Sequence, residues 1–476
     1  MDASQPSWLR VRIVGRLEVL SPLHVGSGNV VPTTRMGKDG QQTEPTLVNA
    51  LCRTAAGRPY LPASTLRGAV RARLADADTV NRELGVRLFG TTHDEDGQMG
   101  KLRFYDAVQT DDRQPDLRSA IAIDPLFGVV EAHKLFVRQV VPPGCQFDLT
   151  IEADRVDAAE LMAVLGLLDT FGRGIGRGIG AGKSKDQGLM SWQRDRVEVI
   201  DQVALAEWLR HDTATALPWS TLPVIPASAQ CAEADLPGVE FSIEFNSPWL
   251  VDAPELHRAK SDEEEHPPDL EFSRLADGRA WLPASSLKGW LRGRARRVMM
   301  TLFVGNGLGP ELAGNNVDML LKDLFGATDQ TSWLLVSDAL GDIKYSRGHE
   351  QQFVAIDRFT GGSSEGALYK VHAAPPCKVG GRIGWRSTPD PSGDWRLALL
   401  AMVARDAMEG DLVIGWGKAR GYGQGTARLR LPDQPEDRFC DWPALAEWLG
   451  EGDQFEPHLQ AFRKLFHSST KEASHA

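Results

Sequence analysis

Cysteine pairs and long apolar runs are lacking in this chain, and each absence excludes a class of protein. The five cysteines lie far apart in the sequence, at Cys52, Cys145, Cys231, Cys377 and Cys440. Without a CxxC pair or a compact spacing, they argue against a disulfide framework and against a zinc site. No apolar run reaches the ~18 residues of a membrane span, and the N-terminus lacks the pattern of a secretory signal. We therefore expect a cytoplasmic protein with no membrane partner.

An excess of positive charge is lacking as well. The 476 residues carry a net charge of −11, which argues mildly against a nucleic-acid partner. The basic residues are nevertheless clustered, in KGWLRGRARR (288–297), RGAVRAR (67–73) and the glycine-rich stretch 172–185. Locally basic surfaces on an acidic protein can still bind phosphate.

One set of segments occurs twice in the same order, which indicates a domain duplication. The matching pairs are GRPYLPASTLRGAVRARL (57–74) with GRAWLPASSLKGWLRGRA (278–295), RLFGTT (87–92) with DLFGAT (323–328), KLRFYDA (101–107) with WLLVSDA (333–339), IAIDPLFGVVEAHKLF (121–136) with VAIDRFTGGSSEGALY (354–369), and GRGIGAGKSKDQG (176–188) with IGWGKARGYGQGT (414–426). One such match could arise by chance, but this ordered set indicates two copies of one domain.

The repeat defines the expected domains. We place the first domain at 8–198, a Pro- and Ala-rich linker at 216–237, the second domain at 238–432 and a helical C-terminal segment at 440–467. Each copy begins with an alternating strand and continues with a helix, short strands, a second helix and a last strand. This order predicts an α+β, ferredoxin-like fold for both copies.

A PAS motif precedes a basic helix in each copy. We expect Ser64 and Ser285 to cap these helices. Backbone N–H groups and arginines at a helix start can bind phosphate. The cations expected to do so are Arg67, Arg71, Lys288 and Arg292. The alternative is an ordinary solvated helix face.

A glycine-rich loop ends each copy. Neither loop is a Rossmann or Walker motif, because both follow a helix instead of a strand. Glycines let a backbone lie close to sugar and phosphate, and nearby cations supply charge. The expected RNA-contacting cations here are Arg177, Lys183 and Lys185 in the first loop, and Lys418 and Arg420 in the second. The alternative is a flexible turn.

Together these motifs resemble the RAMP superfamily, and specifically the backbone subunits of type III CRISPR effector complexes. The resemblance rests on LHVG (23–26), PASTLRG (62–68), PASSLKG (283–289), the LFG and DA sites, IDRFTGGSSEGALY (356–369) and GKARGYGQG (417–425). It implies two tandem modified RNA-recognition folds with inserted loops and a thumb hairpin, which assemble along a guide RNA. The thumb of such subunits intrudes into the guide–target duplex.

The resemblance also implies a site for cleavage of target RNA. Family members that cleave carry an aspartate before the PxSSLKG segment and depend on a divalent metal, for which we expect magnesium; which metal it is stays open. Asp269 lies 14 residues before Pro283, where that aspartate should fall. Asp252 ranks behind it, and Glu44 and Asp39 are the candidates in the first copy. The alternative is that Asp269 is one more acid of a solvated loop.

The two copies differ at other motif positions. His24 of LHVG is present only in the first copy, where it could contact RNA or be structural. Arg358 of the IDR segment is present only in the second copy. We expect both copies to bind the guide and at most one to cleave.

The sequence therefore predicts a guide-RNA-binding backbone subunit of a type III CRISPR effector, with target-RNA endoribonuclease activity in the second domain. Its expected partners are the guide RNA, the target RNA and other effector subunits. Three alternatives stay open. They are a purely structural subunit of the same complex, an RNase that processes guide precursors, and a scaffold that binds only protein.

Overall fold

The computed structural model describes residues 7–33, 46–75, 79–91, 97–123, 130–211, 215–223, 232, 235–252, 268–275, 278–344, 349–430, 439–450 and 453–473. The chain forms two compact units. The first comprises residues 1–118, 136–183 and 187–235, and the second comprises 236–476 with the short segments 119–135 and 184–186. We call residues 7–211 the first repeat and residues 236–430 the second repeat.

The central sheet of the first repeat has five antiparallel strands in the order β11-β10-β1-β9-β5. These strands are β1 (Ser7–Val19), β5 (Leu102–Phe104), β9 (Gln146–Asp157), β10 (Met190–Ile200) and β11 (Ser220–Thr221). Helix α1 (Ala63–Arg71) lies between β1 and β5 in the chain, and α3 (Ala158–Leu168) lies between β9 and β10. Counted in chain order without the edge strand β11, the strands are arranged 4-1-3-2, which fits the predicted ferredoxin-like fold.

Alternation along β1 determines which face of this sheet is buried. Val11, Ile13 and Leu17 point into the hydrophobic core, so Arg10 and Arg12 point to the opposite face. Edge strand β11 comes from the stretch predicted as a linker and pairs with β10. The first part of that stretch therefore belongs to the sheet.

The remaining elements of the first repeat surround this sheet. They are β2 (Gly26–Thr33), β3 (Thr46–Leu51), β4 (Tyr60–Leu61), α2 (Thr79–Phe89), β6 (Ala107–Val108), β7 (Asp116–Ile123), β8 (Val130–Val140), the 3-10 turn η1 (Lys183–Lys185) and α4 (Gln202–His211). A second sheet has the order β2-β3-β8-β7, in which β3 runs parallel to β8.

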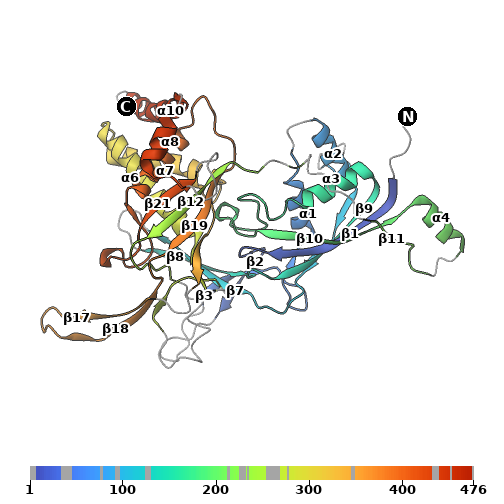
Figure 1. Cartoon of the computed structure of the whole chain (residues 1–476), viewed down its shortest axis with the longest axis horizontal. Coiled ribbons are helices and arrows are strands. Elements are labelled where there is room, and N and C mark those ends of the chain that lie inside the picture. The colour runs from blue at the N-terminus through green and yellow to red at the C-terminus, as the bar shows by residue number, and fades with distance from the viewer. Residues whose placement is uncertain are drawn as a thin grey trace. The chain divides into compact units, whose positions relative to one another are not determined.

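The second repeat follows the same plan. Its main sheet has the order β14-β16-β19-β12-β21-β20, and β15 also pairs with β19. The strands are β12 (Gly238–Phe245), β14 (Arg279–Leu282), β15 (Leu334–Val336), β16 (Ala339–Lys344), β19 (Lys378–Trp385), β20 (Leu412–Val413) and β21 (Gln424–Arg430). The helices are α6 (Ala284–Gly305), α7 (Pro310–Phe325) and α8 (Trp395–Met408), and they gather on one side of the sheet (Figure 1).

A long hairpin projects from the second repeat (Figure 1). It consists of β17 (His349–Ile356) and β18 (Ser363–Ala373), and the short strand β13 (Leu270–Glu271) pairs with β18 in parallel. The pairing of β3 with β8 is the equivalent feature in the first repeat. Each repeat thus inserts a hairpin between its second and third core strands.

Two helices follow the second repeat, α9 (Trp442–Gly450) and α10 (Glu456–Ala473). Phe462 and Phe466 of α10 are buried in the core of the second repeat, and the Phe466 ring lies 4.6 Å from that of Phe303. The C-terminal segment is therefore packed onto the domain. Among the described residues, no helix is long and apolar enough to cross a membrane.

Candidate nucleic-acid interface

The two glycine loops have the same backbone conformation. In the first repeat, three backbone amides donate hydrogen bonds to carbonyl groups: Ile179 to Gly188 (2.8 Å), Ala181 to His24 (2.9 Å) and Gly188 to Pro22 (3.0 Å). In the second repeat, the same bonds join Ile414 to Gly423 (3.0 Å), Trp416 to Leu250 (2.7 Å) and Gly423 to Pro248 (2.9 Å). The match of 176–188 with 414–426 along the sequence is therefore out of register by three residues, because Gly188 corresponds to Gly423 and not to Thr426.

Glycine is required at the end of each loop. Gly188 and Gly423 have φ values of 76° and 74°, in the left-handed region that favours glycine. A Cβ atom on either residue would also collide with the carbonyl oxygen of Ile179 or Ile414. Both loops thus share one set of backbone hydrogen bonds and the same requirement for glycine.

The loop cations sit on short 3-10 turns. In the realigned register, Lys183 corresponds to Lys418 and Lys185 to Arg420, on η1 and on η2 (Lys418–Arg420). Lys183, Lys418 and Arg420 are exposed, and Lys185 is half-buried. Both repeats therefore present two cations at the same place on a rigid loop, as contact with a phosphate backbone requires.

Arg177 has a different position in the first loop. It is half-buried, and its carbonyl oxygen accepts a hydrogen bond of 2.9 Å from the guanidinium of Arg73. Arg73 is itself buried against the ring of Phe171, 3.6 Å away, and burial lowers its pKa to about 10. The backbone at Arg177 thus helps to attach the loop to the end of α1.

The predicted serine caps are wrong. The N-cap residues of α1 and α6 are Pro62 and Pro283, which have no side chain that could cap. Ser64 and Ser285 are exposed residues of the first turn. They stay candidates for contact with RNA by their position at a helix start, but they do not begin the helix.

An aspartate from the DA motif caps each helix instead. Asp106 accepts a hydrogen bond of 2.7 Å from the amide of Ala63, and Asp338 accepts one of 2.7 Å from the amide of Ala284. A carboxylate at this place satisfies a free helix amide and complements the helix dipole. The DA and PAS motifs therefore form one structural unit in each repeat.

Arg67 and Lys288 occupy equivalent positions and bind carbonyl groups near the LFG motifs. Arg67 donates to the carbonyl oxygen of Phe89, the last residue of α2. Lys288 donates to the hydroxyl of Ser332 (2.7 Å) and to the carbonyl oxygen of Leu334 (3.2 Å). The Phe89 carbonyl is at a helix C-terminus, where such groups lack intrahelical partners and favour cations, whereas Leu334 begins strand β15.

The prediction that Lys288 contacts RNA is corrected by its burial. Its exposed fraction is 8%, and burial lowers its pKa to about 7. The amine faces the protein interior, where it donates to Ser332 and Leu334. Arg71 and Arg292 remain exposed, although Arg71 also donates to the carbonyl oxygen of Gly90 at 3.4 Å.

His24 is a structural residue of the first repeat. The ring is 9% exposed, and its Nδ1 atom lies 2.6 Å from the carbonyl oxygen of Gln139 on β8. Because the acceptor is a carbonyl group, Nδ1 carries the proton. Burial lowers the pKa of His24, which favours the neutral ring. His24 therefore connects the glycine loop, through its own carbonyl group, with the hairpin strand.

Arg358 lies in the turn at the tip of the second hairpin. Asp357 holds this turn by accepting hydrogen bonds from the amides of Phe359 (2.9 Å) and Thr360 (2.7 Å), and the bonds from Thr360 lower the pKa of Asp357. Arg358 is exposed, and the Phe359 side chain is 98% exposed. The IDRFT segment thus builds a fixed turn that presents a cation and an aromatic ring.

Asp269 is attached to the second hairpin. Its carboxylate accepts a hydrogen bond of 2.8 Å from the amide of Lys370 on β18, and its own amide donates to the Lys370 carbonyl oxygen at 2.8 Å. Asp269 is half-buried, so it is not the freely solvated acid of the alternative interpretation. Seven residues of strand, roughly 23 Å, separate its anchor at Lys370 from the start of β18 at the hairpin tip.

The first repeat has no carboxylate at the position of Asp269. The Ser273 amide donates to the Val251 carbonyl group, and the Cys52 amide donates to the Val25 carbonyl group in the same way. Counting back from these two residues makes Val48 the equivalent of Asp269. Val48 is fully buried and pairs with β8. Asp39 and Glu44, the other acids considered for the first repeat, lie outside the described residues.

Several charged side chains share the face of the hairpin sheet that carries Asp269. Lys370 and His372 follow each other on one face of β18 and contact Glu350 of β17 at 3.0 and 3.6 Å. Glu271 is 1% exposed and forms an ion pair of 2.7 Å with Arg274. Asp252 is used structurally, since it accepts a hydrogen bond of 3.2 Å from the Glu271 amide.

These acids do not form a preassembled metal site. In the described part of the chain, no group of three or more His, Cys, Asp or Glu side chains could hold a metal ion. The single half-buried carboxylate of Asp269 fits a divalent cation only if RNA oxygens supply the remaining ligands.

Sequence reasoning missed an aromatic cluster at the base of the second hairpin. It joins Phe353 of β17 and Tyr369 of β18 to Trp416, Arg420 and Tyr422 of the glycine loop. Comparison of the two copies could have found it, since the first glycine loop has Ala181 and Gln187 where the second has Trp416 and Tyr422.

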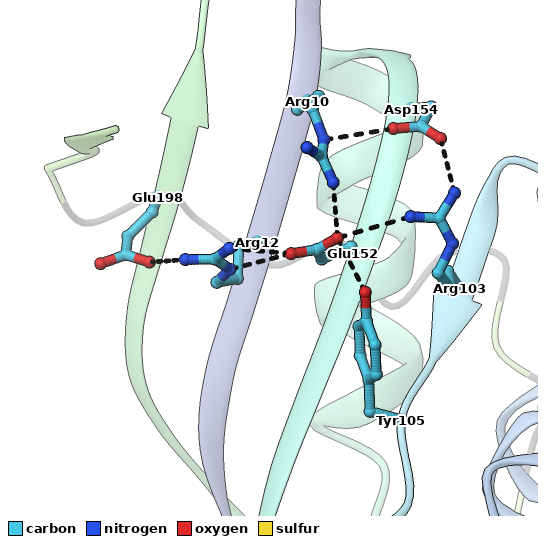
Figure 2. A network of polar contacts seen from close by, with 7 residues as sticks. All are labelled: Arg10, Arg12, Arg103, Tyr105, Glu152, Asp154 and Glu198. Atoms are coloured by element: carbon cyan, nitrogen blue, oxygen red, sulfur yellow. Dashed lines mark hydrogen bonds and ion pairs between the residues drawn. The ribbon is translucent and has the colours of Figure 1, made fainter. Parts of the chain in front are cut away.

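The open face of the first central sheet carries an ion-pair network (Figure 2). Glu152 of β9 is 5% exposed and accepts hydrogen bonds from Arg10 (2.7 Å), Arg12 (2.9 Å) and Tyr105 (3.0 Å). Burial acts to raise the pKa of Glu152, but these donors outweigh it and the pKa is lowered. Trp219 covers the Arg12 guanidinium at 4.1 Å.

The second repeat has no such network at the same place. The cross-strand pair Arg12 and Glu152 is replaced by Gly238 and Gly384. RNA-recognition motifs stack bases on aromatic side chains of this sheet face. Here ion pairs occupy it in the first repeat, and glycines with the ion pair of Glu240 and Arg430 occupy it in the second. The glycine loops, helix starts and hairpins are therefore the better candidate interface.

Two ferredoxin-like domains in tandem, each with a basic glycine loop and an inserted hairpin, define the class of this protein as a duplicated α+β protein. A family model of the RAMP superfamily matches residues 16–190 and 242–426. The chain therefore belongs to the RAMP superfamily, which indicates a CRISPR-associated RNA-binding subunit. No curated protein sequence gives a significant match.

Proposed function

We propose that the chain is a guide-RNA-binding backbone subunit of a type III CRISPR effector complex and that its second domain cleaves target RNA. The observation that supports guide binding most strongly is the pair of glycine loops, which hold cations in one fixed conformation in both repeats. A chain with two such loops would cover two consecutive intervals of the guide.

Salt dependence tests the guide-binding part of the proposal. Each phosphate contact adds about 0.7 to the slope of log affinity against log salt for single-stranded RNA. Lys183→Ala and Lys418→Ala should each lower this slope by about that amount, and the double variant should lower it by about twice as much. A Glu198→Gln variant on the sheet face serves as control. If neither variant changes the slope, the loop lysines do not contact RNA phosphates, and the loops are not part of the interface.

Asp269 is the residue to which we assign cleavage. Its carboxylate would act as a general base or as a ligand of a magnesium ion that activates the ribose 2′-OH of the target. Lys370 fixes the position of the carboxylate through its amide. Val48, at the equivalent position of the first repeat, offers no such group, so only the second domain would cut.

The test uses two variants in the assembled effector complex. Asp269→Asn keeps an oxygen that can accept the hydrogen bond from Lys370 and removes the charge, while Asp269→Ala removes both. We expect both to lower cleavage opposite the second domain by about 10²- to 10⁴-fold. Unchanged cutting at every position would refute the assignment, and loss with Asp269→Ala alone would show that the residue only holds the strand.

A purely structural, guide-binding subunit is the second candidate. The observation that favours it is the hydrogen bond that already occupies one oxygen of Asp269. In that case the complex would bind target RNA with normal affinity, and neither Asp269 variant would alter its cleavage pattern.

A further inference from the structure

The cage around Arg420 connects two parts of the candidate interface of the second repeat. The Arg420 guanidinium lies 5.1 Å from the ring centre of Trp416, 5.2 Å from Phe353 and 5.7 Å from Tyr369. It also donates a hydrogen bond to the Tyr369 hydroxyl. Cation–π contacts and this hydrogen bond fix a side chain that would otherwise be mobile on an exposed loop.

The rings themselves join the glycine loop to the hairpin. Phe353 and Tyr369 stack at 5.3 Å across β17 and β18, and Trp416 meets both edge-on at 5.6 and 6.3 Å. Tyr422, at the end of the loop, is in contact with Trp416 at 5.4 Å. Its hydroxyl donates to the Gln351 side chain on β17. Loop and hairpin therefore share one packed contact, and a shift of either must disturb it.

The same hairpin strand carries the anchor of Asp269. Tyr369 is the residue before Lys370, whose amide binds the Asp269 carboxylate at 2.8 Å. The next residues continue the attachment, since Leu270 pairs with Val371 in parallel. A continuous path of direct contacts thus leads from Arg420 through Tyr369 and the Lys370 backbone to Asp269.

Arg420 is suited to sense an anion at the outer end of this path. It is exposed, and its guanidinium has donors beyond the one used by Tyr369, which can bind phosphate in a bidentate manner. The first repeat has Lys185 at this position, and it has Ala181 and Gln187 in place of Trp416 and Tyr422. The cage therefore exists only in the repeat that has Asp269.

We propose that Arg420 and its aromatic cage are a positioning device, which transmits the binding of an RNA phosphate at the glycine loop to the hairpin strand that holds Asp269. This inference rests on the proposed function of the loop as a guide-binding element. Phosphate bound to Arg420 adds contacts to a guanidinium that the rings already hold, restricts its remaining motion and thereby stiffens β18. Arg420 itself is a positioning residue and does not touch the scissile bond.

Hydrogen exchange on the full chain tests the proposal without any need for cleavage. The probe is a guide-length single-stranded RNA of mixed sequence, added at saturating concentration. In the unaltered protein, RNA should slow the exchange of amides in 363–373 by about tenfold. In Tyr369→Phe and Trp416→Ala this slowing should be lost, while RNA binding through Lys418 remains.

Three comparisons separate the coupling of loop and hairpin from effects on folding and on RNA affinity. Tyr369→Phe keeps the ring and the stack on Phe353 and removes only the hydroxyl, so it should fold normally. Lys418→Ala removes a neighbouring loop cation outside the cage. It should weaken RNA binding and leave the slowing of exchange at saturation intact. Arg420→Lys, which keeps a cation over the rings, should restore part of the slowing that Arg420→Ala loses.

The outcomes distinguish this inference from the function on which it rests. Slowing of exchange that persists in Tyr369→Phe and Trp416→Ala overturns the positioning device, and so does RNA binding that leaves 363–373 unaffected in the unaltered protein. Absence of RNA binding overturns the guide-binding function as well. Slowing that depends on the cage supports the device, even if the Asp269 variants show that this domain does not cleave.

Discussion

The aspartates that cap α1 and α6 give the sharpest test of how the motifs build the fold. Replacing Asp338 by alanine removes the 2.7 Å hydrogen bond to the Ala284 amide and a negative charge at the start of a long helix. Loss of an N-cap costs about 1 kcal/mol, and the helix dipole adds about 1 kcal/mol at a partly buried site. Asp338 is half-buried, so we expect the change to cost about 2 kcal/mol.

The repeat supplies an internal comparison. Asp106 makes the same 2.7 Å bond to Ala63, but it is exposed. There the alanine variant should cost only about 1 kcal/mol, because the dipole contribution is screened by solvent. Asp338→Asn, which keeps an acceptor oxygen and loses the charge, should fall between the two.

Hydrogen exchange in the first turn of each helix measures these values in the full chain. A cost of 2 kcal/mol corresponds to exchange about 30-fold faster, and 1 kcal/mol to about fivefold. Ser285→Ala is the control, since Ser285 was the predicted cap and should change exchange by less than about twofold. The reasoning fails if Ser285→Ala matches Asp338→Ala, or if Asp338→Ala leaves the first turn of α6 unchanged.

Three further predictions concern the ion-pair network, the buried lysine and the glycine loop. Glu152→Gln should lower the free energy of unfolding by about 1–3 kcal/mol at pH 7. Because the folded pKa of Glu152 lies below the unfolded value of 4.5, this difference should persist above about pH 4.5 and disappear in urea titrations as the pH falls through the folded pKa. Lys288 has a folded pKa of about 7 against 10.5 unfolded, so its unfolded form binds more protons in that window. Unaltered protein should therefore gain about 2 kcal/mol relative to Lys288→Met between pH 7 and 9, and a constant difference would contradict the burial of a neutral amine. Gly423→Ala should destabilise the loop by more than about 2 kcal/mol and weaken RNA binding, because its Cβ would collide with the Ile414 carbonyl group. The matched change Gly421→Ala, with positive φ but open space around it, should cost about 1 kcal/mol, and equal effects in thermal unfolding and RNA binding would speak against the collision.

Much of the architecture could be predicted from the sequence. The duplication and the α+β order follow from motifs that recur in the same order, since each motif marks a turn, a cap or a close backbone approach. The spacing of Asp269 from Pro283 singled out a residue that the structure attaches to β18, and its role in cleavage stays a prediction. Turns, caps and close backbone approaches depend on a few neighbouring residues, so the residue types of a short segment are enough to indicate them.

The roles of individual motif residues could be decided only by tertiary structure. Sequence suggested that Ser285 caps α6 and that Lys288 faces RNA. In the structure, Asp338 between β15 and β16 caps the helix, and the Lys288 amine donates to the Ser332 hydroxyl. The three-residue error in matching the glycine loops has the same origin, because hydrogen bonds to Pro22 and Pro248 fix the register.

The cluster that carries the further inference is the clearest example of this division. Phe353, Tyr369, Trp416 and Arg420 are scattered over three segments of the chain, and each taken separately is an ordinary residue. They meet because β17 and β18 return beside the loop before β21, and long-range packing of this kind leaves no local pattern in a sequence. The sequence by itself determined that there are two copies of one domain. Tertiary contacts decided that, in the second copy, Arg420 is packed against the hairpin strand whose backbone holds the Asp269 carboxylate.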